Sequence, residues 1–208
     1  MSQKTLEFFY DFSSPYAYLA HEEAERVSEG HGATLVYRPF FLGGLFKSLE
    51  SALVPIHEAS EQKRKWLSKD IGRWAEIREM PFQWPTQFPM NTITALRVVL
   101  QLLGDENAEA HRRVCRAIFR AYWADDLNIS DPEVLAKVLD SADVDAVALL
   151  TKTREPQVKA LLFSATEEAL ERGAVGAPTF FVDDLCFWGQ DRFEMVSRAL
   201  QGWRPKGG

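Results

Sequence analysis

The sequence predicts an α/β fold in which a mixed four-stranded sheet is interrupted by a large helical insertion. Strand-like runs occur only near the two ends of the 208-residue chain: one pair flanks a helical pattern, and the other pair is joined by a short turn. Between them the pattern is almost wholly helical. We therefore expect residues 1–43 and 173–208 to form one discontinuous domain, with residues 44–172 as an all-helical domain inserted into it.

The first half of the sheet is predicted from an apolar run at Leu6 to Phe12 and a second at Ala33 to Phe41. Between them, Ser13-Ser14-Pro15 is a helix-start signal, because a serine hydroxyl can cap an unpaired N–H and proline suits the first helical position. A helix with an apolar face follows, to about Glu29. This strand–helix–strand order predicts a parallel pair of strands. Gly43 and Gly44 then mark a break in the chain.

The insertion and the second half of the sheet follow from periodicity and turn signals. The stretch from Pro81 to Pro89, between the expected helices Lys63–Arg78 and Asn91–Leu103, carries three prolines and three bulky aromatic residues. We therefore expect it to be a packed loop. The expected helices are Lys63–Arg78, Asn91–Leu103, Ala108–Trp123, one beginning at Asp131-Pro132, Asp143–Thr153 and Pro156–Arg172. The expected final elements are strands Phe180–Val182 and Leu185–Trp188 and a helix over Gln190–Gln201.

Composition restricts the partners and the location. The formal net charge of −6 gives no general attraction for nucleic acid or an anionic membrane surface. The chain has no basic and apolar leader and no apolar run long enough to span a bilayer, so we expect a cytoplasmic protein. Its two cysteines, Cys115 and Cys186, lie far apart, predict neither a disulfide framework nor a metal site, and are expected to be small buried hydrophobic residues.

Three short motifs are candidates for chemistry. Ser14 stands at a helix N-terminus, which stabilises an anion such as a thiolate, although the hydroxyl can equally be a cap alone. Ala177-Pro178 precedes a strand; a cis bond there would present the backbone of Ala177 to a ligand, whereas the alternative is an ordinary proline at the start of a strand. Gln190 and Asp191 can cap the final helix or bind an ammonium or amide group.

The order of these motifs resembles that of a known family. The carrying segments are Tyr10–Leu19, Tyr37–Gly44, Asp70–Ala75, Phe88–Thr92, Gly176–Phe180 and Phe187–Arg192. On them the sequence resembles, nearly end to end, the 2-hydroxychromene-2-carboxylate isomerases and the kappa-class glutathione transferases, a branch of the DsbA-like proteins. The resemblance implies a thioredoxin-like fold, and it implies glutathione as the cofactor.

The resemblance also implies roles for individual residues. The hydroxyl of Ser14 would donate to the glutathione sulfur. The backbone of Ala177, before a cis Pro178, would pair with the cysteinyl part, and Gln190 with Asp191 would hold the γ-glutamyl group. Lys63, by its spacing from Asp70, would bind the glycyl carboxylate; the alternative is a solvated basic helix face, since Arg64 and Lys65 follow it.

Two positions depart from related proteins. DsbA-like oxidoreductases carry Cys-x-x-Cys where this chain has Ser14 and Ala17, so dithiol exchange is not expected. The isomerase and transferase branch has a glutathione-binding asparagine in the region after Lys47; here Ser51 can stand in for it, or the contact is lost.

A small aromatic substrate is the second expected ligand, in a pocket that includes Tyr16, Asn91 and Trp84. Asn91 can instead be a helix N-cap, and the aromatic residues can instead belong to the core or to a dimer interface. The resemblance implies a homodimer.

The expected activity is isomerisation of 2-hydroxychromene-2-carboxylate-like aromatic catabolites by reversible addition of the glutathione thiolate, with Ser14 as the catalytic residue. Two alternatives stay open. One is a glutathione transferase, which would consume glutathione. The other is a non-catalytic thioredoxin-like module that binds a peptide or protein.

Overall fold

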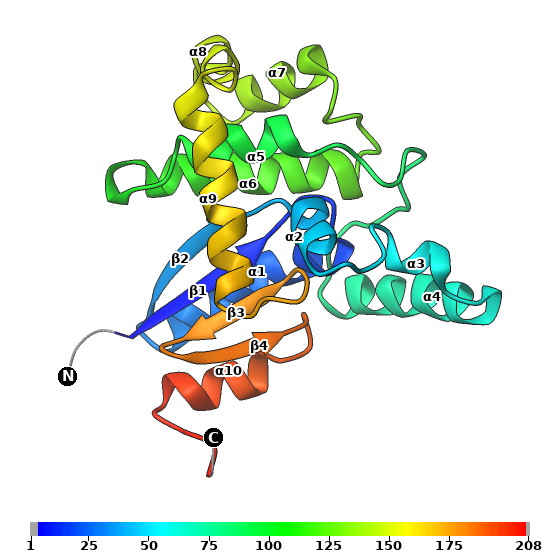
Figure 1. Cartoon of the computed structure of the whole chain (residues 1–208), viewed down its shortest axis with the longest axis vertical. Coiled ribbons are helices and arrows are strands. Elements are labelled where there is room, and N and C mark those ends of the chain that lie inside the picture. The colour runs from blue at the N-terminus through cyan, green and yellow to red at the C-terminus, as the bar shows by residue number, and fades with distance from the viewer. Residues whose placement is uncertain (1–3, 207–208) are drawn as a thin grey trace.

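A single mixed sheet forms the centre of the computed structural model, which describes residues 4–206. Its strands are β1 (Thr5–Tyr10), β2 (Thr34–Pro39), β3 (Thr179–Val182) and β4 (Leu185–Trp188), arranged in the order β2-β1-β3-β4 (Figure 1). The two halves of the chain therefore meet at the β1–β3 pair. This is the mixed four-stranded sheet that the sequence predicts.

Pairing within the sheet follows from the connections. Strands β1 and β2 are parallel, because α1 (Pro15–Gly30) returns the chain to the end of the sheet at which β1 begins. Strand β3 runs antiparallel to β1, with Phe180 opposite Phe8, and β3 and β4 form a short antiparallel hairpin. Consequently β1 ends beside the point where β3 begins, and this places the turn after β1 next to the turn before β3.

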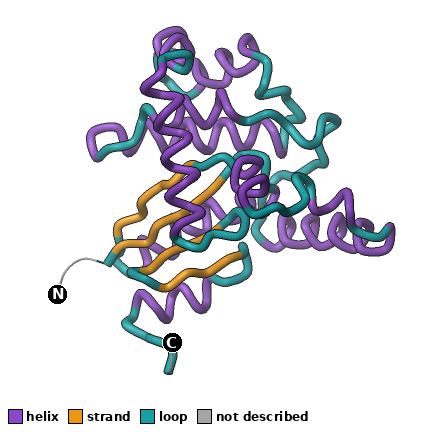
Figure 2. Tube along the Cα trace, viewed as in Figure 1, coloured by secondary structure: helices purple, strands orange, loops and turns teal. Residues whose placement is uncertain are grey.

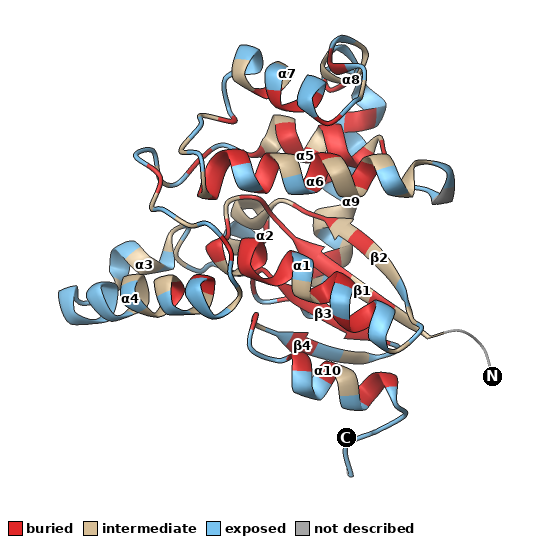
Figure 3. Ribbon diagram, turned by 180° about the vertical axis from the view of Figure 1, so that it is seen from behind, coloured by how far each residue is buried: buried red, intermediate tan, exposed pale blue. Residues whose placement is uncertain are grey.

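Helices cover both faces of the sheet. Helices α1 and α10 (Phe193–Leu200) pack on one face, where α1 contacts β1 and β2 and α10 contacts β3. Helix α9 (Pro156–Glu171) crosses the opposite face and contacts β2. The two opposite views agree on this layering, and buried residues concentrate on the sheet and on the helix sides that face it (Figures 1 and 3). Among residues 4–206, no helix combines the length and the apolar character needed to cross a bilayer.

The segment between β2 and β3 contains helices joined by loops and no strand within the described residues, as expected, and its longest loop is the one before α5 (Figure 2). Besides α9 it contains α2 (Leu42–Ser48), α3 (Pro55–Glu58), α4 (Glu61–Ile77), α5 (Ile93–Leu100), a 3-10 turn (Asp105–Asn107), α6 (Ala108–Trp123), α7 (Pro132–Ser141) and α8 (Ala146–Lys152).

The expected break at Gly43 and Gly44 is wrong, because helix α2 runs through both. Their lack of a side chain serves packing. A Cβ atom on Gly43 would lie 2.8 Å from the ring of Phe41. One on Gly44 would lie 3.1 Å from the same ring and 3.3 Å from the methyl of Thr166 on α9. The glycines therefore let α2 approach Phe41 and α9 closely.

The core is continuous between the sheet and the helical segment. The ring of Phe8 stacks on Tyr10 at 5.0 Å and on Phe180 at 5.3 Å. From Tyr10 the aromatic contacts continue to Phe119 on α6, 5.7 Å away. These residues are fully buried and belong to one apolar cluster. The division into residues 1–43 with 173–208 and residues 44–172 stays a prediction.

Candidate functional site

Ser14 stands between β1 and α1, and its hydroxyl has two backbone partners. As the N-cap of α1, its Oγ accepts a hydrogen bond from the N–H of Ala17 at 3.2 Å. The same oxygen donates to the carbonyl oxygen of Ala177 at 2.7 Å. Ser14 is only 4% exposed. The hydroxyl is therefore a cap and also a link to the second half of the chain.

A buried carboxylate shapes the turn that carries Ser14. Asp11 is fully buried, and its oxygens accept from the N–H of Ser13 at 2.9 Å, the hydroxyl of Thr92 at 2.7 Å and the N–H of Leu42 at 2.7 Å. Burial raises the pKa of Asp11, and these hydrogen bonds oppose that rise. Asp11 thus holds the turn, the start of α2 and the start of α5 together.

Ala177 and Pro178 lie directly beside this turn. The peptide bond between them is cis, as expected. The carbonyl of Ala177 accepts from Ser14, and the carbonyl of Pro178 accepts from the N–H of Gly189 at 3.0 Å. The short segment before β3 is therefore held from α1 on one side and from the loop after β4 on the other.

The loop between β4 and α10 supplies Gln190 and Asp191. The side chain of Gln190 is buried, and its Oε1 has no hydrogen-bond partner within the described residues. The carboxylate of Asp191 is half exposed and pairs with the guanidinium of Arg192 at 2.6 Å. A buried amide oxygen without a donor is unusual, because such groups are nearly always paired. Within the described residues, the Oε1 atom of Gln190 is therefore available to accept from an N–H or ammonium group.

One cleft of about 490 Å³ collects nearly all of the expected site residues. From the segments that form the sheet and its adjoining turns it takes Ser14, Tyr16, Ala177, Pro178, Gln190 and Asp191, and from the helical segment between β2 and β3 it takes Lys63 and Trp84. Ser14 and Gln190 are buried, Tyr16 and Trp84 are half-buried, and Lys63 is exposed. Burial raises the pKa of Tyr16, and the carboxylates of Asp70 and Asp191 add to the rise.

Two residues considered for the site do not line this cleft. Asn91 is exposed, and its Oδ1 accepts from the N–H of Ile93 at 3.1 Å. Asn91 is outside the lining of this cleft, and its contact with Ile93 favours the alternative that it caps the turn before α5. Ser51 is also exposed and outside the lining, with its hydroxyl directed to the carbonyl of Phe46 at 3.4 Å.

One wall of the cleft is apolar and was not predicted from the sequence. It comes from α2 and the segment leading into α3, neither of which the periodicity predicts. Its members are Leu42, Phe46, Leu53, Val54, Pro55 and Ile56. Pro55 at the first position of α3 was a usable signal, since proline suits that position. With Tyr16, Trp84 and Phe88, this wall gives the cleft a largely apolar interior.

The cysteines lie outside the cleft. Cys115 is buried in α6 as expected, and burial raises the pKa of its thiol well above the ordinary range. The expectation that Cys186 is buried is wrong. Strand β4 is one of the two edge strands of the sheet, and its residues alternate, so Phe187 points into the core while Cys186 and Trp188 are exposed.

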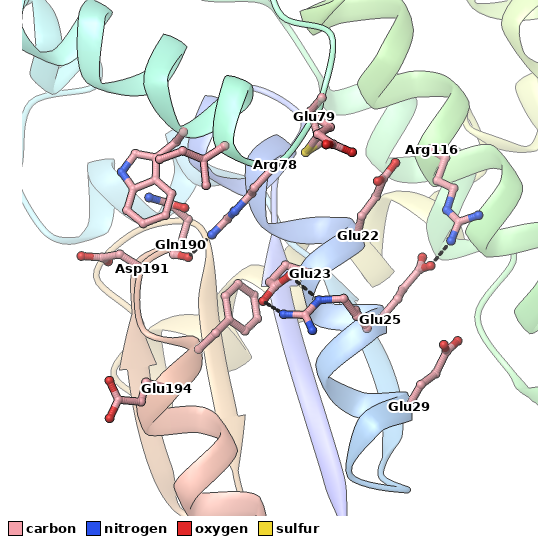
Figure 4. Close-up of a pocket in the computed structure, with 15 residues that line it drawn as sticks. Glu22, Glu23, Glu25, Glu29, Arg78, Glu79, Arg116, Gln190, Asp191 and Glu194 are labelled. Carbon is pink, nitrogen blue, oxygen red and sulfur yellow. Dashed lines mark hydrogen bonds and ion pairs between the residues drawn. The ribbon is translucent and has the colours of Figure 1, made fainter.

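A second cleft, of about 780 Å³, opens beside the first between α1, the end of α4 and α10 (Figure 4). Its labelled walls are mainly charged, with Glu25 paired to Arg116, and it contains neither Ser14 nor Pro178. It shares Trp74, Gln190 and Asp191 with the first cleft. The smaller cleft is the candidate site because the Ser14 and cis-Pro178 motifs meet there.

Comparisons with known proteins point to one group. The profile described as DsbA-like thioredoxin domain matches residues 5–201. The chain is 29% identical to 2-hydroxychromene-2-carboxylate isomerase of Sphingobium xenophagum over 95% of this chain and 98% of that protein. It is 28% identical to glutathione S-transferase kappa 1 of Rattus norvegicus, over 95% and 91%. A solved structure of 2-hydroxychromene-2-carboxylate isomerase superposes with a TM-score of 0.84 at 22% identity, covering 95% of both chains.

Proposed function

The chain belongs to the DsbA-like thioredoxin domain family, and on that premise we propose that it is a glutathione-dependent isomerase of 2-hydroxychromene-2-carboxylate-like aromatic compounds. The curated relatives supporting this are isomerases and kappa-class glutathione transferases, which are enzymes matched over nearly their whole lengths. The observation that carries the proposal is the 2.7 Å hydrogen bond from Ser14 to Ala177. It brings the helix-start serine and the cis-proline segment to one point in an apolar cleft.

The residues of the cleft fit a bound tripeptide thiol. Gln190 offers a buried acceptor without a partner, which suits an N–H or ammonium donor. Asp191 offers a carboxylate for the same end of the ligand, in competition with Arg192. Lys63 lines the cleft with an ammonium that suits a terminal carboxylate. Glutathione carries all three complementary groups.

Ser14 is placed to hold a sulfur anion. A hydroxyl has one proton to donate, and here that proton is directed to Ala177. Rotation about the Cβ–Oγ bond would redirect it to a thiolate without moving the backbone. The N-terminus of α1 adds the partial positive charge of the helix dipole, which favours the ionised sulfur. Ser14 and the first turn of α1 would thus keep the thiol ionised.

The remaining lining would hold and shield an aromatic substrate. Tyr16, Trp84 and Phe88 provide flat apolar surfaces, and the α2–α3 segment provides the facing aliphatic wall. When bound, glutathione supplies a nucleophilic thiol that adds reversibly to an unsaturated carbon of the substrate. The chain itself contributes orientation and exclusion of water. No thiol of the described residues lines the cleft, so the proposal assigns no redox step to the protein.

A stoichiometric assay tests the proposal. The protein is incubated with 2-hydroxychromene-2-carboxylate and one equivalent of reduced glutathione, and the isomeric products and the free thiol are measured together. An isomerase gives the trans product with the thiol unchanged. Loss of one thiol per product indicates a transferase. Absence of turnover, together with tight binding of a peptide in a separate measurement, indicates the non-catalytic module. Ser14→Ala is the matched inactive variant.

The finer expectations of a homodimer and a cytoplasmic location stay predictions. Sedimentation equilibrium of the full chain tests the first, and fractionation of the source cells tests the second.

A further inference from the structure

Arg78 lies where α4 ends and contacts three parts of the chain at once. Its Nη2 donates to the carbonyl oxygen of Gln190 at 2.7 Å. Its Nη1 donates to the carbonyl oxygen of Leu19, in the second turn of α1, the helix that Ser14 caps. One guanidinium therefore connects α4, α1 and the loop between β4 and α10, with Arg78 directed toward that loop in Figure 4.

The guanidinium is enclosed by aromatic rings as well as by carbonyls. Its central carbon lies 5.1 Å from the centre of the Trp74 ring and 5.7 Å from that of Phe193. Burial lowers the pKa of Arg78, while the carboxylates of Glu23 and Asp191 raise it. An arginine keeps its charge under such conditions, because its intrinsic pKa is very high. Arg78 is thus a charged, half-buried group that is fixed by two hydrogen bonds and two aromatic contacts where it lines the larger cleft.

The loop that Arg78 contacts has few other backbone supports. Gly189 turns with a φ of +116° and donates its N–H to Pro178. Helix α10 does not begin until Phe193, so Gln190 and Asp191 lie in irregular backbone between these two points. The Arg78 hydrogen bond falls on the carbonyl of Gln190 itself. It is therefore positioned to fix where this pair of side chains stands relative to α1.

We propose that Arg78 is a positioning residue for glutathione. By bridging Leu19 and Gln190, it sets the distance between the Gln190–Asp191 pair, which would hold the γ-glutamyl end, and Ser14, which would hold the sulfur. This inference rests on the proposed function. Arg78 acts through the loop and does not line the smaller cleft.

The geometry needs an arginine. The planar guanidinium carries N–H groups that point in several directions, so Nη1 and Nη2 reach two different carbonyl oxygens. Its flat faces meanwhile pack on Trp74 and Phe193. A lysine ammonium keeps the charge, but it is compact and has no flat surface to pack on the aromatic rings. We expect it to keep at most one of the two hydrogen bonds. A methionine keeps much of the apolar volume and neither hydrogen bond. Arg78→Lys and Arg78→Met therefore form a graded pair.

Binding of two thiols by titration calorimetry tests the proposal without using turnover. Reduced glutathione carries the γ-glutamyl group, and cysteinylglycine lacks it. We expect Arg78→Met to weaken glutathione binding by about tenfold or more, since hydrogen bonds to charged groups are worth that much. Arg78→Lys should lie between Arg78→Met and wild type. Cysteinylglycine binding should be the same in all three. The control is Arg73→Met, which replaces an exposed arginine on the same helix and should change neither ligand.

Amide hydrogen exchange of the free protein provides the second readout. In Arg78→Met we expect faster exchange at the N–H groups of Gly189 and Val196, which donate to Pro178 and Arg192, with unchanged exchange in the strands. If wild type binds no glutathione, the proposed function fails, and exchange still decides whether Arg78 holds the loop. Unchanged glutathione affinity with unchanged exchange overturns the positioning role. So does an equal loss of both ligands with faster exchange throughout, which would mean a general structural role. Should Arg78→Met not fold, the same criteria apply to Arg78→Lys.

Discussion

The hydroxyl of Ser14 donates to the carbonyl oxygen of Ala177 over 2.7 Å, although 163 residues separate the two positions in the chain. The same hydroxyl oxygen accepts from the N–H of Ala17, so one atom caps α1 and ties its first turn to the cis-proline segment. This relationship exists because β3 pairs with β1, which brings the turn before β3 beside the turn after β1. The site is thus a consequence of how the sheet closes.

Ser14→Ala removes both hydrogen bonds without removing much volume. We expect the variant to fold and to lose about 1–2 kcal/mol of unfolding free energy, the usual cost of losing a helix cap. Urea unfolding followed by circular dichroism measures it. Asp131→Ala is the control, since Asp131 caps α7 far from the cleft, and it should lose a similar amount while binding ligands as wild type does. An unchanged midpoint for Ser14→Ala would mean that neither hydrogen bond contributes.

Asp11→Asn tests the buried carboxylate. Both oxygens of Asp11 accept, one of them from the N–H of Leu42. An amide has only one accepting oxygen, so its NH₂ group would face a donor in the fully buried site. We expect a loss of about 2–3 kcal/mol, as for an unsatisfied buried group. Asp125→Asn breaks only an exposed pair with Arg120 and should cost less than about 1 kcal/mol. Equal losses for the two variants would contradict this account of Asp11.

Acid should destabilise the protein through two buried histidines. Burial lowers the pKa values of His21 and His111 to about 4 from an ordinary value of 6.5. As pH falls from 6.5 to 4, the unfolded chain therefore binds protons that the folded chain does not, and the unfolding free energy falls. The contribution of each imidazole to the unfolding free energy should be complete above pH 6.5. It should fall by about 3 kcal/mol by pH 4, at ~1.4 kcal/mol per pKa unit.

Unfolding by urea at a series of pH values from about 4.5 to about 7 measures this dependence. This range covers most of the interval between the folded-state and the ordinary pKa of the two histidines. His111→Gln should flatten the curve, because it removes one of the two groups. His57→Gln, at an exposed position, should leave the slope of wild type. A slope for His111→Gln that is as steep as that of wild type would exclude His111 as a source of the acid sensitivity.

Two glycine-to-alanine changes should act in opposite directions. Gly72 lies inside α4 with no atom within 4 Å of an added Cβ, so Gly72→Ala should stabilise by about 0.5–1 kcal/mol. At Gly44 the added Cβ meets the methyl of Thr166 at 3.3 Å, and Thr166 is held by a hydrogen bond from the N–H of Phe41. We expect Gly44→Ala to destabilise by about 1 kcal/mol or more, because overpacking outweighs the helical gain. Thermal melts of both variants decide, and a stabilised Gly44→Ala would contradict the packing argument.

Much of the fold could be predicted from the sequence because its signals are local. The cap at Ser14, the cap at Asp131 and the strand runs of β1, β3 and β4 appear in the structure within two residues of the expected positions. Helix α2 was hidden because paired glycines ordinarily signal a turn, whereas here they permit close packing. Helix α3 has only four residues and shows no periodicity.

The site was less predictable because it depends on long-range contacts. Neither the hydrogen bond between Ser14 and Ala177 nor that from Arg78 to Gln190 leaves a pattern in the sequence. Gln190 falls within the expected final helix, but the structure places it in the loop before Phe193, because Gly189 turns the chain with positive φ. Local patterns therefore named the residues, and only the folded chain shows which of them meet.

Titration of the protein with reduced glutathione, with the thiolate followed by its ultraviolet absorbance, tests the central claim most directly. We expect wild type to bind glutathione and to ionise its thiol at neutral pH, and we expect Ser14→Ala to lose the thiolate signal while staying folded. Absence of binding at millimolar glutathione, or a thiolate signal that persists unchanged in Ser14→Ala, would contradict the assignment of this cleft to a glutathione-dependent enzyme.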